Sequence, residues 1–291
     1  HLKRVIPADL HMISGSMDDQ VSMEASDIRE FELPKASGKS GGACTAAFLQ
    51  TMYKTNDDDD DEDDSDDSDD SDDSDDDDDD SSDDDNKKKK KKKKKKNDKL
   101  TWFDLVTSMR EALEEMGYEQ MPQLSSTCLL DIVQEPFEIV PKKNSKKAGN
   151  KRAILIGINY VGQGDGELRA CHNDSNNMKA YLKKMHGFQE KDMLILMDDG
   201  KHHSPTRANI LKAFQKINEY SIPGDVVFMH YSGHGGRIRD RSGDEEDGQD
   251  ETIIPVDFQQ AGHIVDDDIF KHFVLPMSPG VNATVLMDCC H

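Results

Sequence analysis

An alternation of apolar runs and amphipathic segments in the second half of the chain constrains its fold more than any other feature. Residues 153–158 form a continuous apolar run bounded by polar residues, which is typical of a strand buried on both faces. Apolar residues recur at helical spacing over 168–185, and a second strand-like run follows at 193–197. The pattern predicts an α/β protein with a mainly parallel sheet and helices on both faces.

The same alternation continues towards the carboxyl terminus. The segment 204–206, Ser-Pro-Thr, is expected to open a helix by N-cap chemistry, with Pro205 as the first helical residue. Two further strands are expected at 225–229 and 283–287. Functional sites in sheets of this kind lie at the carboxyl ends of the strands.

These last two strands run into residues that carry chemistry. The first enters a loop in which His234 stands between two glycines, and the second ends in Asp-Cys-Cys-His at 288–291. We expect the glycines to leave room for the backbone of a substrate beside the imidazole. Two strands that end side by side would bring a thiol to an imidazole, which is the basis of a cysteine nucleophile with a histidine base.

Two other interpretations of these residues are open. A cysteine at a strand end is commonly a small buried apolar residue, and Cys289, one residue before Cys290, is expected to point the other way and pack in the core. A zinc site is disfavoured, because its two histidines would lie on a strand and a glycine loop rather than on one helix face, and adjacent cysteines chelate poorly. The potential zinc ligands are His230, His234, Cys289, Cys290 and His291.

The first half of the chain contains fewer regular elements. A short strand is expected at 8–13 and a helix at 43–54. A second helix is expected after Thr101, a suitable N-cap, and before Gly117. The remaining expected elements are an edge segment at 122–126 and a linker over 136–149.

Two charged tracts separate these helices. Residues 57–85 are only Asp, Glu and Ser, and residues 87–96 are ten consecutive lysines. Neither tract can bury apolar surface and each repels itself, so both are expected to be disordered. Nucleic-acid binding by the lysines is disfavoured, because the neighbouring carboxylates compete for them.

The cysteines and the hydropathy of the chain indicate the cellular compartment in which it is expected. The chain has five cysteines without a framework spacing, and it shows neither a secretory signal nor an apolar run long enough to span a bilayer. We therefore expect free thiols in a reducing cytoplasm and no membrane partner. The sequence opens on His1 rather than Met and stops at a strand end, so we expect a fragment.

The motifs of the second half resemble those of metacaspases, which are relatives of the caspases. Over about residues 151–291 the chain is similar to the large catalytic subunit of that family, which implies a caspase-like three-layer sandwich. The motifs that carry the resemblance are His-Tyr-Ser-Gly-His-Gly at 230–235, Asp-Cys-Cys-His at 288–291, Leu-Arg-Ala-Cys-His-Asn-Asp at 168–174, the acidic segment 243–251, and Pro-Thr-Arg-Ala-Asn-Ile at 205–210.

The amino-terminal part resembles the small subunit of the same family, at 13–20 and 118–125. In most metacaspases the small subunit follows the large one, so the order here is similar to the permuted type III class of algae. Val21 and Glu24 depart from the Thr and Asp usual in the small subunit. The expected division is a small-subunit-like part at 1–56 and 98–140, whose two flanks should pack together, a low-complexity insertion at 57–97, a linker at 141–151 and a catalytic part at 152–291.

The resemblance also implies roles for the site residues. Cys290 is the expected nucleophile, and His234 is the base that takes its proton. Two carboxylates beside a nucleophile attract a guanidinium or ammonium group, so cleavage after Arg or Lys is expected. The alternative roles are structural, with Asp174 as a solvated helix residue or cap and Asp288 as an acid that orients backbone amides. The residues of the expected specificity pocket are Asp174, Asp288, Ser232 and Cys171.

Calcium is the cofactor that the resemblance implies, as an activator. Hard cations bind carboxylates gathered on loops, and the expected ligands are Asp250, Asp266 and Asp267. The family has a fourth aspartate after the nucleophile, and this sequence stops before it, so the calcium site is expected to be incomplete. The alternative role of the acidic segment 244–251 is solvated surface charge.

The expected function is therefore a calcium-dependent cysteine endopeptidase that cuts protein or peptide substrates after Arg or Lys. The alternative is a truncated or inactive homologue that acts as an acidic interaction scaffold. The expected self-cleavage sites are the lysines at 87–96 together with Lys142, Lys143, Lys146 and Lys147.

Overall fold

The computed structural model describes most of both halves of the chain. The described residues are 6, 8–17, 20, 22–25, 27–33, 38–57, 99–141, 149–239, 243 and 248–290. The charged tracts beyond Asp57 lie outside this set, and so do the expected self-cleavage lysines and Val21. The expected disorder of the tracts therefore stays a prediction.

The centre of the molecule is a six-stranded sheet with the strand order β4-β1-β11-β7-β5-β6. Every neighbouring pair in it is parallel except β4 with β1, so the predicted, mainly parallel sheet is confirmed. Its strands are β1 (Asp9–Ser14), β4 (Gln123–Ser126), β5 (Lys151–Gly157), β6 (Met193–Met197), β7 (Val226–Ser232) and β11 (Asn282–Asp288).

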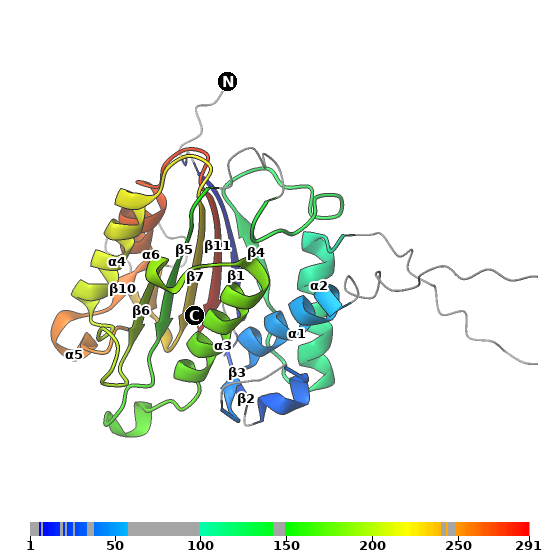
Figure 1. Ribbon diagram of the computed structural model, residues 1–291. Helices are drawn as coiled ribbons and strands as arrows, with labels where there is room; N and C mark the ends of the chain where they lie inside the picture. The colour runs from blue at the N-terminus through cyan, green and yellow to red at the C-terminus, as the bar shows by residue number, and fades with distance from the viewer. Residues whose placement is uncertain are drawn as a thin grey trace, which may run out of the picture.

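Helices cover both faces of this sheet and complete three layers (Figure 1). One face carries α1 (Ala43–Asp57), α2 (Trp102–Glu115) and α3 (Cys171–His186). The other face carries α4 (Arg207–Tyr220) and the short π-helix Phe270–Val274 that follows α6 (Asp266–Ile269). The predicted caspase-like three-layer sandwich is thereby confirmed.

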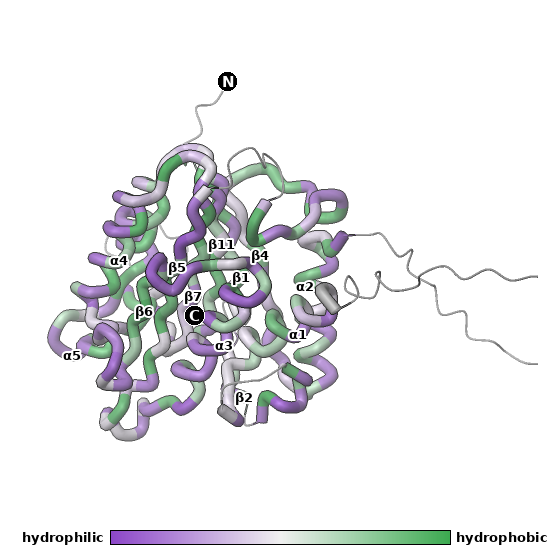
Figure 2. The backbone as a smooth tube through the Cα atoms, in the orientation of Figure 1, coloured by the Kyte–Doolittle hydropathy of each residue, from purple (hydrophilic) through white to green (hydrophobic). Residues whose placement is uncertain are grey.

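The apolar run of β5 explains why both faces need cover. Successive side chains of a strand point to opposite faces. Ala153 and Leu155 accordingly lie in the core beneath α1, α2 and α3, whereas Ile154 and Ile156 lie in the core beneath α4. Figure 2 shows the central strands as mainly hydrophobic, with hydrophilic positions on the outward sides of the helices.

The amino-terminal segment completes the sheet from far away in the sequence. Strand β1 lies parallel to β11, with Ser14 opposite Met287. Helices α1 and α2, which flank the charged tracts, pack against each other in one core. Thr101 caps α2 as predicted, in a capping box with Asp104, and Gly117 follows the helix with a φ of 79°.

Several boundaries differ from the sequence predictions; the strand predicted at 225–229, for example, continues to Ser232. Helix α3 begins at Cys171 rather than at 168, because the amide of Leu168 donates to the carbonyl of Asn159 and keeps the preceding residues in a loop. Helix α4 begins at Arg207, since Thr206 and not Ser204 is its N-cap, so Pro205 precedes the helix. The segment predicted as a linker from 136 contributes Phe137 and Ile139 to the core, and Phe137 packs edge-on against Trp102 at 4.7 Å.

Smaller elements surround the sheet. A three-stranded antiparallel sheet contains β8 (Gly235–Arg239), β9 (Gln249–Ile253) and β10 (Ile264–Val265), and a two-stranded one contains β2 (Glu24–Ala25) and β3 (Gly41–Gly42). A short helix α5 (Phe258–Ala261) precedes β10. The pattern did not predict these short elements.

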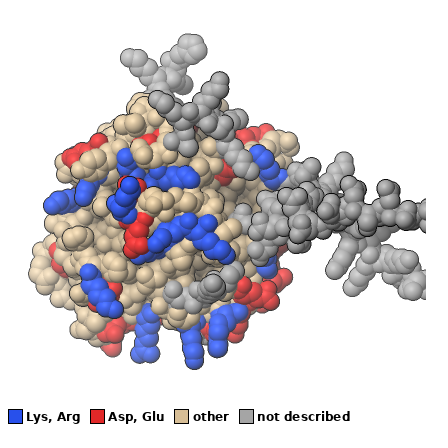
Figure 3. All heavy atoms as spheres, viewed as in Figure 1, with Lys and Arg blue, Asp and Glu red and all other residues tan. Residues whose placement is uncertain are grey.

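On the face shown in Figure 3, Lys and Arg side chains are interspersed with Asp and Glu. No helix in the described ranges is both long and apolar enough to cross a bilayer.

Candidate active site

The structure brings the loop of His234 and the end of the Cys290 strand together at one edge of the sheet. Strands β7 and β11 are neighbours, and their last paired residues are Ser232 and Asp288. Both His234 and Cys290 lie two residues beyond this pair. The backbone of Gly235 lies so close to the carbonyl of Cys290 that a Cβ on this glycine would stand 1.7 Å from the oxygen.

The two glycines beside His234 are required by close approaches within the protein. A Cβ on Gly233 would stand 2.8 Å from the phenol oxygen of Tyr231 and 3.2 Å from that of Tyr160. Gly235 faces the backbone of Cys290 instead. The sequence interpretation assigned this space to a substrate backbone, and the structure corrects it: buried phenols and the backbone of Cys290 occupy the space.

Cys290 is half-buried, whereas Cys289 is buried in the core beneath α4, as predicted. The thiol of Cys290 donates to the carbonyl of Ser22 with an Sγ–O distance of 3.7 Å. Burial raises the pKa of this thiol, and the charge of Asp288 acts in the same direction. The thiol is therefore protonated in this arrangement and needs a base to become a nucleophile.

One nitrogen of the His234 imidazole is held by a backbone carbonyl. Its Nε2 lies 2.8 Å from the carbonyl oxygen of Gly166. A carbonyl can only accept, so Nε2 carries the proton of a neutral ring and Nδ1 is the basic nitrogen. The ring also packs against Tyr160 with centroids 4.6 Å apart.

The four residues expected to form the specificity pocket lie together but are closed off. Both carboxylates face Gly42 of β3, where a Cβ would stand 2.1 Å from Asp288 Oδ2 and 3.0 Å from Asp174 Oδ2. The amide of Gly42 donates to both oxygens of Asp174 at 2.9 Å, and Ser232 Oγ donates to Oδ2 at 2.7 Å. The exposed fractions are 1% for Asp174, 5% for Asp288, 2% for Ser232 and 4% for Cys171.

Asp288 is held by two residues that the sequence interpretation did not identify. Ser22 Oγ donates to Oδ1 at 2.7 Å, while the amide and hydroxyl of Thr45 donate to Oδ2 at 2.8 and 2.7 Å. The hydroxyl of Thr45 also lies 3.0 Å from Nε2 of His230. Burial lowers the pKa of His230 to about 3, so its ring is neutral. Nε2–H donates to Thr45, whose own proton goes to Asp288. No local pattern links these residues, because 185 and 243 positions separate the pairs.

The pKa values of the two carboxyl groups are raised. For Asp174 burial is the main cause, and the nearby charge of Asp288 adds to it. For Asp288 burial is again the main cause, opposed by the hydrogen bonds from Ser22 and Thr45. Two such neighbours in a buried space favour one protonated and one ionised carboxyl group over two negative charges.

The residues expected to bind calcium lie on β9 of the smaller sheet and at the start of α6. Asp250 is a buried residue of β9, and α6 begins with Asp266 and Asp267 directly after β10 and packs against β9. Within the described ranges no three His, Cys, Asp or Glu side chains are gathered as metal ligands. The described residues alone therefore do not fit a calcium site, and acidic residues 244–247 lie outside them.

Comparisons with known proteins agree with the class that this sheet edge defines, a cysteine hydrolase. The family model for the metacaspase peptidase C14 domain matches residues 151–291. Metacaspase III c of Phaeodactylum tricornutum is 39% identical over 287 residues, which are 98% of this chain and 73% of that protein. The chain therefore belongs to the metacaspase family and is a cysteine-type endopeptidase of the C14 class.

Other relatives match only the catalytic half. Metacaspase-1A of Aspergillus fumigatus is 50% identical over 149 residues, which are 50% of this chain and 36% of that protein. The chain thus spans about a third of this fungal relative. Among solved structures, a protein from Geobacter sulfurreducens has 33% sequence identity to this chain. The match covers 49% of this chain and 51% of the Geobacter protein, with a TM-score of 0.39.

Proposed function

We propose that the chain cleaves polypeptides after Arg or Lys, with Cys290 as the nucleophile and His234 as its base. The contact between Gly235 and the Cys290 carbonyl carries this proposal, because it holds the loop of the base against the strand of the nucleophile. The raised pKa of the thiol supports it too, since a protonated thiol requires a base.

In the proposed reaction, Nδ1 of His234 takes the proton from Sγ of Cys290. The thiolate attacks the carbonyl carbon of the scissile bond, and the imidazolium protonates the leaving amine. Water then hydrolyses the thioester, with the same imidazole as base. The carbonyl of Gly166 keeps the ring oriented throughout by accepting from Nε2.

Specificity for a basic side chain is the second part of the proposal. Asp174 and Asp288 face one glycine, and within the described residues neither forms an ion pair. Without a substrate, a bound proton reduces the negative charge of the pair. A guanidinium or ammonium group of the substrate would supply the positive charge instead. Because both carboxyl groups are buried, the substrate side chain reaches them only after β3 moves aside.

Calcium activation is a third and separate part of the proposal. Three successive acidic residues at the start of α6 lie against β9, which carries Asp250. Asp250, Asp266 and Asp267 are not gathered as a ligand group among the described residues, so calcium binding would have to draw them together with further ligands to reach six to eight oxygens. No step of the peptide cleavage is assigned to the ion.

Fluorogenic peptides that end in Arg, Lys or Asp test the reaction and the specificity. The expected result is turnover of the Arg and Lys peptides only, its loss in Cys290→Ala and His234→Ala, and a selective loss for basic peptides in Asp288→Asn. Cys128→Ala is the matched control, since this free cysteine is also partly buried but lies on the segment after β4. Equal turnover by the wild type and Cys290→Ala would remove Cys290 from its role.

The alternative function, an inactive acidic scaffold, predicts a different outcome. A scaffold does not react with an electrophilic arginyl ketone, whereas the peptidase forms an adduct at Cys290 that intact-mass spectrometry detects. Self-cleavage after lysines 87–96 or Lys142, Lys143, Lys146 and Lys147 is proposed as well. An active preparation that stays a single band on a denaturing gel would contradict it.

A further inference from the structure

The loop from Asn159 to Ala170, between β5 and α3, contacts the base at three points. The amide of His234 donates to the phenol oxygen of Tyr160 at 3.0 Å. The rings of the same two residues lie 4.6 Å apart, centroid to centroid, with a tilt of 36°. The carbonyl of Gly166 accepts from Nε2. One short loop therefore touches the backbone, the ring face and a ring nitrogen of His234.

Two buried phenols hold the backbone of His234 on both sides. Tyr160 accepts from its amide, and the phenol of Tyr231 donates to its carbonyl at 2.7 Å. The proton of Tyr160 goes to the carbonyl of Ile254 at 2.6 Å. Burial raises the pKa of both phenols, so they remain protonated and keep these bonds at any working pH.

Tyr160 adopts a backbone conformation that few residues other than glycine tolerate. Its φ is 54°, in the left-handed region. Such a conformation persists only where the surrounding structure enforces it, and it clusters at functional sites. The position of the Tyr160 ring beside His234 therefore depends on the contacts that enforce this turn.

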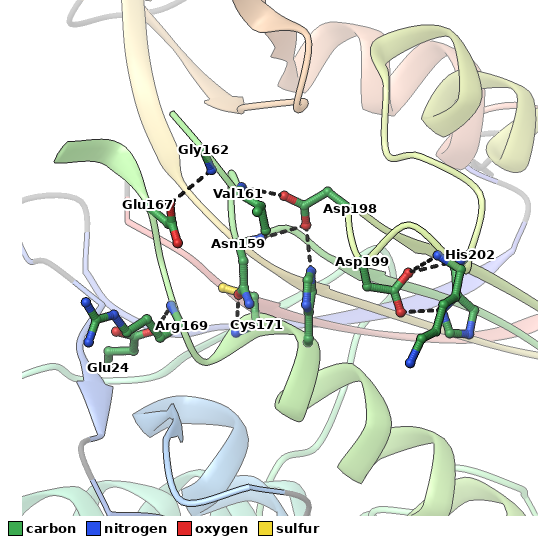
Figure 4. A network of polar contacts seen from close by, with 12 residues as sticks. Glu24, Asn159, Val161, Gly162, Glu167, Arg169, Cys171, Asp198, Asp199 and His202 are labelled. Carbon is green, nitrogen blue, oxygen red and sulfur yellow. Dashed lines mark hydrogen bonds and ion pairs between the residues drawn. The ribbon is translucent and has the colours of Figure 1, made fainter. Parts of the chain in front are cut away.

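Asp198, at the carboxyl end of β6, enforces the turn. Its Oδ1 accepts from the amide of Asn159 at 2.9 Å and its Oδ2 from the amide of Val161 at 3.0 Å, so one carboxylate grips both neighbours of Tyr160 (Figure 4). Nε2 of His172 lies 2.6 Å from Oδ1. Burial acts to raise the pKa of Asp198, but the bonds from His172 and the two amides outweigh it and lower the pKa. The carboxylate is therefore ionised.

From these contacts we infer that Tyr160 is a positioning residue for His234, and that Asp198 sets the conformation of Tyr160. The inference rests on the proposed role of His234 as base. Proton transfer from Sγ to Nδ1 depends on the orientation of the imidazole, and a displacement of about 1 Å can cost about a hundredfold in rate. The two phenols hold the backbone of His234, and the Tyr160 ring and the Gly166 carbonyl hold its imidazole.

Four variants of the full chain test the inference. Tyr160→Phe keeps the ring and removes the hydroxyl, and Asp198→Asn weakens the grip on the turn. The matched controls are Tyr181→Phe, a buried phenol of α3 that contacts His186, and Asp199→Asn, whose carboxylate binds the turn at 201–202. The readouts are kcat and KM on an Arg-ended peptide, and the pH profile of Cys290 alkylation by iodoacetamide in a Cys128→Ala background.

We expect Tyr160→Phe to lower kcat about tenfold with little change in KM, and to move the alkylation profile to higher pH, because a misaligned base supports the thiolate less well. Asp198→Asn should act in the same direction, and both controls should match the wild type. Wild-type kcat and alkylation in Tyr160→Phe would overturn the inference, as would an equal loss in Tyr181→Phe. A fully active His234→Ala would overturn the proposed function itself, whereas an inactive His234→Ala beside a normal Tyr160→Phe would overturn the inference alone.

Discussion

Gly235 lies against the carbonyl oxygen of Cys290 more closely than any residue with a side chain could. A Cβ built on this glycine would stand 1.7 Å from the oxygen and 2.8 Å from the carbonyl carbon. Both are backbone atoms of Cys290, two residues beyond the end of β11, so no side-chain rotation can make room. The contact ties β8, which follows His234, to the nucleophile strand.

Gly235→Ala is therefore expected to abolish most peptidase activity, by about a hundredfold or more, because the added methyl forces the base and the thiol apart. Gly236→Ala is the matched control, since a Cβ there would meet its nearest neighbours at 3.6 and 3.8 Å, which is ordinary contact. Steady-state turnover of an Arg-ended peptide measures the difference. Similar activities of the two variants would contradict the tight contact.

Thr45→Val is expected to destabilise the protein by about 1–3 kcal/mol, since it removes one hydroxyl from both Asp288 and His230 in a buried space. Thr51→Val, on the same helix, is the control, because among the described residues the Thr51 hydroxyl donates to the carbonyl of Ala47 four residues earlier, within its own helix. Thermal unfolding should show a clearly lower Tm for Thr45→Val. An equal or larger decrease in Thr51→Val would rule out a special role for the Thr45 bonds.

The raised pKa values of Asp174 and Asp288 predict a pH dependence of stability. Above about pH 4 the unfolded chain, with ordinary carboxyl pKa values near 3.8, has released protons that the folded state still binds. The contribution of the pair to stability therefore falls as the pH rises from about 4 through the raised pKa values. Asp174→Asn, which has no proton to release there, should flatten this decline.

Urea unfolding of the wild type and Asp174→Asn at several pH values between about 4.5 and 8 measures the effect, as the difference in unfolding free energy. As the pH rises, the unfolding free energy of the wild type should fall relative to that of Asp174→Asn. A constant difference over this range would show that the pair is already ionised in the folded state.

Calcium binding predicts a rise of Tm with calcium concentration, because a ligand that binds only the folded state stabilises it. Asp266→Asn and Asp267→Asn should reduce this rise. Asp192→Asn is the control, because it removes the same charge at a site outside the proposed ligands. Asp192 lies directly before β6, which carries none of them. A Tm that does not respond to calcium, or that responds equally in all three variants, would refute these ligands.

The strands that the catalytic half contributes to the central sheet could be predicted from sequence, unlike the short strands β8, β9 and β10. The bounds of β6 agree with the predicted 193–197, β5 and β11 differ by a residue or two, and β7 continues to Ser232 beyond the predicted 225–229. These strands are buried on both faces, so their apolar runs are continuous and their ends are marked by polar residues. Helix starts were less well predicted, because Leu168 has the apolar character of a helix position while its amide bonds to Asn159 in a loop.

The convergence of site residues was predictable in part. His234 and Cys290 each follow a parallel strand, and the carboxyl ends of adjacent parallel strands share one edge. The closed pocket was not predictable, because Gly42 and Ser22 come from the amino-terminal segment and reach Asp174 and Asp288 only in the folded chain. The sequence showed that glycines flank His234, but it did not show that the phenols of Tyr231 and Tyr160 and the backbone of Cys290 lie against them.

The sequence by itself determined the class of fold, the strands that carry the thiol and the imidazole, and the motifs of the family, since each of these is written in residues near one another in the chain. Only the tertiary structure decided what surrounds those groups: the phenols that hold His234, the carboxylate of Asp198 that bends the chain at Tyr160, and the glycine that covers the acidic pair. The reason is physical, because hydrogen bonds and close packing between distant segments depend on how the sheet and its helices assemble, and no local pattern records that.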